Sequence, residues 1–567
     1  MKIFFEEYDY PLEEINEIFD SGLYSRSGGS NARLNAVGYY FSTKVNDSVF
    51  ILPKVFLFDD KEKPAFKRYN PYDIMDIDAN KKAMKKNGDF KVIFDLSIWI
   101  YLAIRQYSKR HPNNKIAIDN LISNVKSVGD INSNTYLDII LSLRKFNKDH
   151  RNLFTLISII NKSGNNRIDW NKTVKKVQPI IQNKKPYYFE FKNKRKAINF
   201  DEELIILFYS VLNYISKWFP SKEPLNLNYD LIKPNRIKSL IETGKGTRIL
   251  KKIRHKYFKD EFVALWSLLY TFFDKSEQIV AKKYTPETLL ARNFNNVFED
   301  MIDVLLGDEQ SSLPDGLKDQ PDGKVVDHIY SDKSLLDESL IYYIGDSKYY
   351  KDTKSLDRNS IYKQFTYAKN VIQVNLNLFF DNKKNWHKIG NRYLRYKDEL
   401  TEGYNVTPNF YVRGNVDPND FDYNSPQIKE EKDNKDNPII RKNKQFENRL
   451  FDRDTLFTKE YNINFLYVIS AYAANADCKH FKEETRKVFR DDIIKLLNGE
   501  YIFYHLEFDT LDRMESFVKD NFRELLGKLY HYDGKLILAI EQSCSDKGKI
   551  LNLVDKECDI VKRYKLS

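Results

Sequence analysis

Residues 341–350 read Ile-Tyr-Tyr-Ile-Gly-Asp-Ser-Lys-Tyr-Tyr, an apolar run that ends with an acid and a lysine two positions apart. β-Branched and aromatic residues in such a run are typical of a buried β-strand. Because side chains alternate across a strand, Asp346 and Lys348 should lie on the same face. We therefore expect this strand to present a carboxylate and an ammonium group together at its end.

A second short strand is predicted upstream, at residues 325–330, and it carries one carboxylate, Asp327. Residues 331–339 are polar enough to form a turn, so antiparallel pairing of the two strands would bring Asp327 beside Asp346. Two literal Pro-Asp pairs precede it, at 314–315 and 321–322, but each is followed by glycine and is typical of a turn. The pattern favours Asp327 as the first acid and leaves Asp322 as the alternative.

An amphipathic helix is predicted at residues 294–306, where the apolar residues recur at three-and-four spacing. Glu299 falls at the border of the apolar arc, where its carboxylate could lean over a sheet edge. Carboxylate oxygens are ligands that Mg²⁺ prefers, and a bound metal ion lowers the pKa of a water ligand. The carboxylates and lysine therefore indicate a site for metal-assisted attack on a phosphate, and the competing interpretation is a surface ion pair at a strand end.

The order of a glutamate on a helix, an aspartate on one strand, and an aspartate and a lysine on the next strand resembles the core of PD-(D/E)xK nucleases. The resemblance places Glu299 on the leading helix, Asp327 on the first strand, Asp346 and Lys348 on the second, and Gln364 on the helix that follows. It implies that Glu299, Asp327 and Asp346 hold Mg²⁺, or Mn²⁺ in its place, and that all five residues are catalytic. It further implies hydrolysis of phosphodiesters to a 5′-phosphate and a 3′-hydroxyl.

Some branches of this superfamily place a tyrosine four residues after the glutamine, whereas Tyr367 follows Gln364 by three. More narrowly, residues 294–299, 345–350 and Gln364 are similar to McrC, the nuclease subunit of McrBC-type restriction systems, and to the McrC-like subunit of LlaJI-type systems. Residues 37–54 resemble the N-terminal strand pair of McrC, and residues 461–467 are also family-like.

The expected architecture is an α/β nuclease domain with a mixed sheet flanked by helices, preceded by two other parts. Residues 1–65 are expected to form a small β-rich head, with strands at 36–41 and 48–53. Residues 66–278 are expected to be mainly helical and to contact the motor partner or DNA. Residues 279–567 are expected to form the nuclease domain, with a flexible insertion near 421–449, where polar residues and proline are dense.

The resemblance implies double-stranded DNA as the substrate and an McrB-like AAA+ GTPase or ATPase as the partner. Residues 244–247 (Gly-Lys-Gly-Thr) lack the spacing of a nucleotide-binding loop, so the energy source would lie in another chain. Two other interpretations stay open: a non-catalytic nucleic-acid-binding scaffold of a defence complex, and a nuclease that cuts alone. The sequence does not reveal which DNA site or modification is recognised, or the oligomeric state.

The chain has 567 residues and a formal net charge of +11, which suits a polyanionic partner. Within residues 183–196, basic residues alternate with aromatic ones and could grip a phosphate backbone, although a solvated hairpin with inward aromatics explains the same pattern. A second basic stretch occupies residues 251–256. The candidate nucleic-acid-binding residues are Lys184, Lys185, Lys194, Arg195, Lys251 and Lys252.

Three widely spaced cysteines make neither a disulfide framework nor a paired-cysteine zinc site. The first residues include two adjacent acids, and the longest apolar stretch, 204–215, is far shorter than a membrane span. We therefore expect a cytoplasmic protein without a membrane segment.

Overall fold

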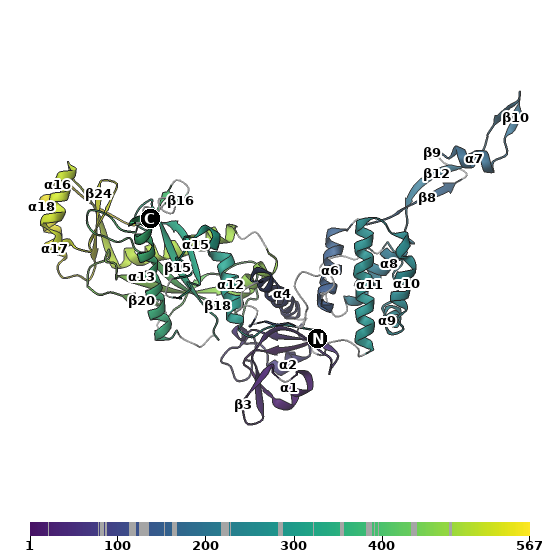
Figure 1. Ribbon diagram of the computed structural model, residues 1–567, viewed down its shortest axis with the longest axis horizontal. Coiled ribbons are helices and arrows are strands. Elements are labelled where there is room, and N and C mark those ends of the chain that lie inside the picture. Colours follow the sequence, from purple (N-terminus) through teal and green to yellow (C-terminus); the bar gives the residue numbers. More distant parts are fainter. Residues whose placement is uncertain are drawn as a thin grey trace. The chain divides into compact units, whose positions relative to one another are not determined.

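The computed structural model divides into two compact units (Figure 1). The first comprises Met1, Phe41–Ser48 and Ser123–Thr288, and the second comprises Lys2–Tyr40, Val49–Ile122 and Leu289–Ser567. Residues 2–40 and 49–122 thus group with residues 289–567. The structure describes residues 1–567 except 21, 78, 80–83, 85–87, 113–118, 120, 124–134, 152, 162–166, 217–225, 227, 282–286, 321–322, 352–355, 381–387, 390–391, 395, 433–438 and 476–478.

The strands expected in the N-terminal head are present, but their sheet recruits strands from elsewhere in the chain. Its order is β1-β6-β5-β13-β7. The bounds are β1 Lys2–Phe5, β5 Val37–Ser42, β6 Asp47–Leu52, β7 Leu121–Ser123 and β13 Thr288–Ala291. A second sheet, β2-β4-β3, and two short helices complete the head: β2 Asp9–Pro11, β3 Tyr24–Gly28, β4 Asn31–Leu34, α1 Leu12–Ile18 and α2 Pro71–Met75.

A mixed six-stranded sheet forms the centre of the second unit. Strands β14 (His328–Lys333) and β15 (Leu340–Lys348) pair antiparallel, as expected. Strand β15 then pairs in parallel with β18 (Pro408–Asn415), which pairs in parallel with β21 (Leu456–Asn464). Parallel neighbours need a crossover connection, and α13 (Arg358–Phe380) lies in the one between β15 and β18. The segment expected to be an insertion adds β19 (Lys429–Glu430) and β20 (Ile440–Asn443) to β21.

Helices cover both faces of this sheet. Helix α12 (Phe294–Leu306), with the bounds that the sequence predicts, contacts β14 and β15 and also packs against α15 (Lys479–Glu500). On the same face, Phe489 of α15 contacts the rings of Phe410 and Tyr461. Helix α13 covers the other face, where Tyr411 donates a hydrogen bond to the Ser360 carbonyl.

Gly345 precedes Asp346 at a point where the sheet has no room for a side chain. A Cβ atom there would lie 2.2 Å from the Phe410 side chain, which belongs to the residue paired with Gly345 in the parallel register. The absence of a Cβ therefore lets the Phe410 ring lie across β15 one residue before the acid.

Residues 501–564 contain a separate four-stranded antiparallel sheet. Its order is β23-β24-β22-β25, and its bounds are β22 Tyr501–Glu507, β23 Leu529–Tyr532, β24 Lys535–Glu541 and β25 Ile560–Tyr564. Three helices accompany this sheet: α16 Leu511–Asp520, α17 Phe522–Leu525 and α18 Lys547–Glu557. Other described elements of the second unit are α4 Asp89–Arg110, α14 Phe465–Ala473, β16 Lys388–Ile389 and β17 Arg392–Tyr393.

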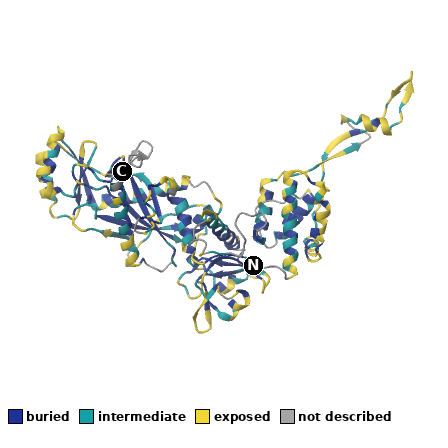
Figure 2. Ribbon diagram, in the orientation of Figure 1, coloured by how far each residue is buried: buried dark blue, intermediate teal, exposed yellow. Residues whose placement is uncertain are grey.

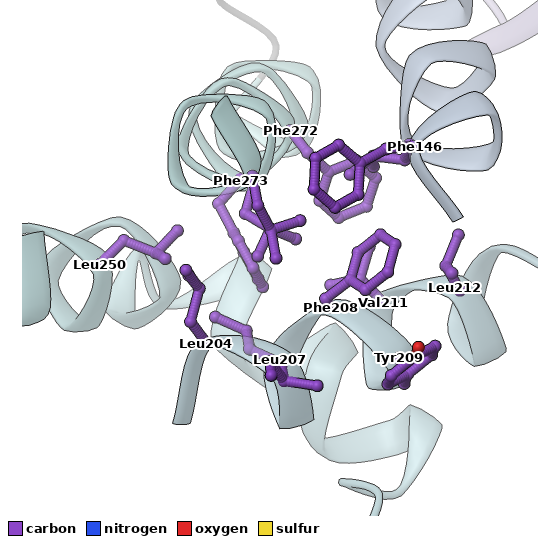
Figure 3. Packing of buried hydrophobic residues seen from close by; sticks show 14 of the residues in the cluster. Phe146, Leu204, Leu207, Phe208, Tyr209, Val211, Leu212, Leu250, Phe272 and Phe273 are labelled. Carbon is purple, nitrogen blue, oxygen red and sulfur yellow. The ribbon is translucent and has the colours of Figure 1, made fainter. Parts of the chain in front are cut away.

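The first unit is built on helices, as the sequence predicts for this region. Their apolar faces meet in one core, where the rings of Phe146 and Phe208 pack edge to face 5.6 Å apart (Figure 3). The bounds are α6 Tyr136–Asp149, α8 Glu203–Ile215, α9 Pro234–Glu242, α10 Lys245–Ile253 and α11 Asp260–Val280. Among the described helices of the whole chain, none has the length and apolar character needed to cross a membrane.

Residues 156–198 form a β-rich segment between α6 and α8, here called the arm. The expectation of a mainly helical middle missed it, because its strands span only two to six residues each. The arm is largely solvent-exposed (Figure 2). It consists of β8 Leu156–Asn161, β9 Arg167–Ile168, α7 Trp170–Lys176, β10 Ile180–Gln182, β11 Lys185–Tyr187 and β12 Asn193–Ile198.

Candidate active site

Asp346 and Lys348 lie on the same face at the end of β15. The Lys348 ammonium forms an ion pair with Oδ2 of Asp346, and only 4 % of the surface of Asp346 is exposed. Burial lowers the pKa of Lys348, but Asp346 and Asp327 more than offset this, so that the net pKa is raised. Lys348 therefore keeps its proton and stands as a fixed cation beside a buried carboxylate.

Asp327 immediately precedes β14, rather than lying within the strand as expected. The antiparallel register sets His328 opposite Gly345, which brings Asp327 to the level of Asp346. The Ser347 backbone N–H donates a hydrogen bond of 3.2 Å to Oδ2 of Asp327. The pKa of Asp327 is raised well above its ordinary value, mainly by burial and then by the charges of Asp346 and Glu299. The alternative acid, Asp322, lies outside the described residues.

Glu299 reaches this group from α12. The pKa of Glu299 is raised to about 7, mainly by burial and then by the charge of Asp346, while the charge of Lys348 opposes both. Electrostatic coupling therefore joins a carboxylate on α12 to the carboxylates at the strand ends. Within the described part of the chain, no three acidic, histidine or cysteine side chains are gathered into a ready-made metal-binding cluster.

Gln364 of α13 lies on the same face of the sheet as Asp346. It is 1 % exposed, and its Nε2 donates to the Ile344 carbonyl at 3.4 Å. Its Oε1 is buried without a hydrogen-bond partner among the residues that the structure describes. The carboxylates of Asp327 and Asp346 and the unsatisfied amide oxygen of Gln364 are hard oxygen donors of the kind that fits Mg²⁺ or Mn²⁺. Mg²⁺ commonly uses one or two carboxylates and completes its coordination with water.

Tyr367, one turn further along α13, is buried, and the Lys363 ammonium lies 5.2 Å from the centre of its ring. Partial burial lowers the pKa of Lys363, but Tyr367, Asp327 and Asp346 raise it on balance. Lys363 is thus a second cation facing the acids. The sequence analysis missed it, although it adjoins Gln364.

A hydrogen-bonded chain on the other face of β15 was also missed. His328 Nε2 lies 2.5 Å from Ser347 Oγ, and its Nδ1 lies 3.4 Å from Oδ1 of Asp303. Lys318 in turn donates to Oδ2 of Asp303 at 2.6 Å. Burial raises the pKa of Asp303, but His328 and Lys318 lower it on balance. This hydrogen-bonded chain fixes the side chain of Ser347, which lies between Asp346 and Lys348 in the sequence. One signal in the sequence could have indicated it, because Asp303 lies one helical turn after Glu299.

A cavity of about 980 Å³ opens beside Glu299 and Lys348. The end of β1 contributes to its wall, since Tyr349 Oη donates to Oε2 of Glu6 at 2.5 Å and Lys54 donates to Glu7 at 2.7 Å. The head sheet therefore helps to shape the approach to the site. Other polar lining residues are Arg292, Asn293, Asn295, Ser347, Tyr350 and Lys351.

The six basic candidates belong to elements of the first unit, whereas the acids belong to the second. Lys184 and Lys185 lie at the turn of the β10–β11 hairpin, and Lys194 and Arg195 lie on β12. Lys251 and Lys252 lie on α10, where the Lys251 ammonium is 5.7 Å from the centre of the Tyr270 ring. The arm candidates and the α10 candidates therefore belong to different elements.

Replacing Glu299 with Gln should stabilise the metal-free protein at pH 8 and change it little at pH 4. In the unfolded chain the carboxyl ionises near its ordinary pKa of 4.5, whereas in the folded protein it does so near 7. The wild type is therefore fully stabilised below pH 4.5 and loses stability as the pH rises through about 7. Urea unfolding with EDTA should give the Gln variant an advantage of roughly 1–3 kcal/mol at pH 8.

The matched control for this measurement is Glu484→Gln, which alters an exposed carboxylate on α15. It should change the free energy of unfolding by the same small amount at both pH values. An equal response of Glu299→Gln at the two pH values would contradict the raised pKa.

An α/β unit with coupled carboxylates and a lysine at a strand end is in keeping with the class of restriction-type nucleases. The family model described as LlaJI restriction endonuclease matches residues 81–419, more than half of the chain, and this stretch includes the carboxylates, Lys348 and Gln364. The chain belongs to the LlaJI restriction endonuclease family. No curated protein gives a significant match.

Proposed function

We propose that this protein is a Mg²⁺-dependent DNA endonuclease of the PD-(D/E)xK type. The observation that carries the proposal is the coupling of Asp327, Asp346 and Glu299 beside the buried Asp346–Lys348 ion pair. Carboxylates whose pKa values are raised by burial and by neighbouring charge, as those of Asp327 and Glu299 are, are typical of catalytic sites when a fixed cation lies beside them. The membership of a restriction endonuclease family supports DNA as the substrate.

The carboxylates of Asp327 and Asp346, with Glu299 beside them, would hold the metal ion, and Mn²⁺ would be an alternative to Mg²⁺. When bound, the ion lowers the pKa of a water ligand and neutralises charge on the phosphate. Lys348 keeps its proton at Nζ and can hydrogen-bond the attacking water or a phosphate oxygen. Gln364 can use its free Oε1 to orient a ligand of the site.

The protein acts, in this proposal, as the McrC-like subunit of an McrBC/LlaJI-type restriction system. The sequence contains no Gly-x-x-x-x-Gly-Lys-Ser/Thr loop, so nucleotide hydrolysis by a P-loop would come from another chain. An McrB-like AAA+ GTPase or ATPase is the partner that the resemblance to McrC supports. The basic residues on the arm and on α10 are candidates for contacts to DNA.

Cleavage of plasmid or phage DNA by the purified protein tests the proposal. The reaction is run with Mg²⁺ or EDTA, and with or without the AAA+ partner and GTP or ATP. Cutting that requires metal, partner and nucleotide is the expected result. Cutting without the partner would support the assignment as a nuclease but contradict its dependence on the motor. Metal-independent DNA binding without cleavage under any condition would support a non-catalytic scaffold instead.

A further inference from the structure

The arm carries most of the excess positive charge of the chain. Residues 167–198 contain ten lysines and arginines and two acids, a net charge of +8, whereas the whole chain has +11. Among the described residues, no ion pair involves a basic side chain of this stretch, so intramolecular partners do not compensate the charge. Such a density of unpaired cations favours a polyanion as the ligand.

The basic side chains are presented at both ends of the arm. Lys184 and Lys185 stand at the tip, where Asn183 and Lys184 adopt φ values of 52° and 60° and close the turn between β10 and β11. Lys194 and Arg195 lie on β12, paired with Ile160 and Ile159 of β8, and both are exposed. Lys172, Lys175 and Lys176 add a third exposed group on α7.

Exposed aromatic rings accompany the cations. Phe189 is 75 % exposed, Trp170 is 55 % exposed and Tyr187 is 46 % exposed, so the hairpin aromatics do not all pack inward. Trp170 forms T-shaped ring contacts with Tyr188 and Phe191, which hold its ring on the arm surface. Exposed rings between cations offer stacking surfaces for bases next to contacts for phosphates.

We infer that the arm is a nucleic-acid-binding element, separate from the residues of the cleavage site. Lys184, Lys185, Lys194 and Arg195 contact phosphates, and Tyr187 and Phe189 stack on unpaired bases. The inference deepens the proposed function, on which it rests for DNA as the ligand, and it concerns binding that needs neither metal nor cleavage. A protein partner would be the other class of ligand for the exposed apolar residues Ile180 and Ile181, but the net charge of +8 favours nucleic acid.

Fluorescence anisotropy of the full chain with labelled duplex and single-stranded DNA, in EDTA and over a range of salt concentrations, tests this inference. The variant Lys184→Gln/Lys185→Gln/Lys194→Gln/Arg195→Gln should bind at least about tenfold more weakly than wild type, and the slope of log K against log[salt] should fall by about 3–4. Because EDTA prevents metal-dependent cutting, a failure of the proposed cleavage chemistry does not affect this result.

The matched control is Lys549→Gln/Lys556→Gln/Lys562→Gln/Arg563→Gln, which removes the same exposed charges from α18 and β25. It should change affinity less than twofold. If the control variant weakened DNA binding as much as the arm variant, the effect would come from net charge alone and the inference would be overturned. An arm variant that binds DNA like wild type, with an unchanged circular dichroism spectrum, would also overturn it. Phe189→Ala should weaken single-strand binding more than duplex binding, and unchanged single-strand binding would overturn the stacking contact.

Discussion

Asp346→Asn is expected to lower DNA cleavage by at least about 10³-fold, because it removes a carboxylate that would hold the catalytic metal ion. The fold should survive the change. The amide has the size of the carboxylate, the coupled acids Asp327 and Glu299 lose a like charge, and Lys348 keeps Asp327 as a neighbouring anion. Single-turnover cleavage, measured with the AAA+ partner and Mg²⁺, gives the loss of rate, and circular dichroism reports the fold.

The matched control is Asp332→Asn, a carboxylate on β14 in the same hairpin. It should retain cleavage within about twofold of wild type. Lys348→Ala should also abolish cutting, but with a larger loss of stability, because the buried Asp346 then lacks its ion-pair partner. Cleavage by Asp346→Asn at the wild-type rate would show that Asp346 does not hold the catalytic metal ion. Unfolding of the Asp346→Asn variant would instead indicate a structural role for this residue.

Phe298→Ala is expected to lower the free energy of unfolding by about 3–5 kcal/mol, the usual cost of truncating a buried phenylalanine. The side chain is 0 % exposed, and its ring stacks on Phe465 with centroids 5.6 Å apart. Tyr349, which follows β15, lies against the same ring, with the ring centres 6.1 Å apart. Because Phe298 precedes Glu299, the lost packing should also loosen the carboxylate on α12.

Denaturant-dependent hydrogen exchange of the α12 amides measures this effect locally, which suits a chain with two compact units. The control is Phe258→Ala, since Phe258 is 84 % exposed and should change stability by less than about 0.5 kcal/mol. Protection of α12 that is equal in the two variants would show that the Phe298–Phe465 contact does not hold the helix in place.

The order of acids and lysine could be predicted because each depends on local pattern. The period of two residues in β15 sets Asp346 and Lys348 on one face, and the period of 3.6 residues in α12 sets Glu299 at the edge of its apolar arc. The polar turn after β14 was sufficient to indicate the antiparallel hairpin, which sets Asp327 level with Asp346. These features needed no knowledge of distant contacts.

The tertiary structure decided what depends on residues far apart in the chain. It brought β13 and β7 into the head sheet, set Phe410 over Gly345, and linked His328 to Asp303 and Ser347. It also revealed the arm, whose two longest strands, β8 (LISIIN) and β12 (NKRKAI), lack the apolar–polar alternation by which a half-buried strand is recognised. The sequence alone therefore determined the local frame of the site. Burial and charge coupling, which raise the pKa values of Glu299 and Asp327, came only from the packing of α12 and the strands together, because both depend on distance through space.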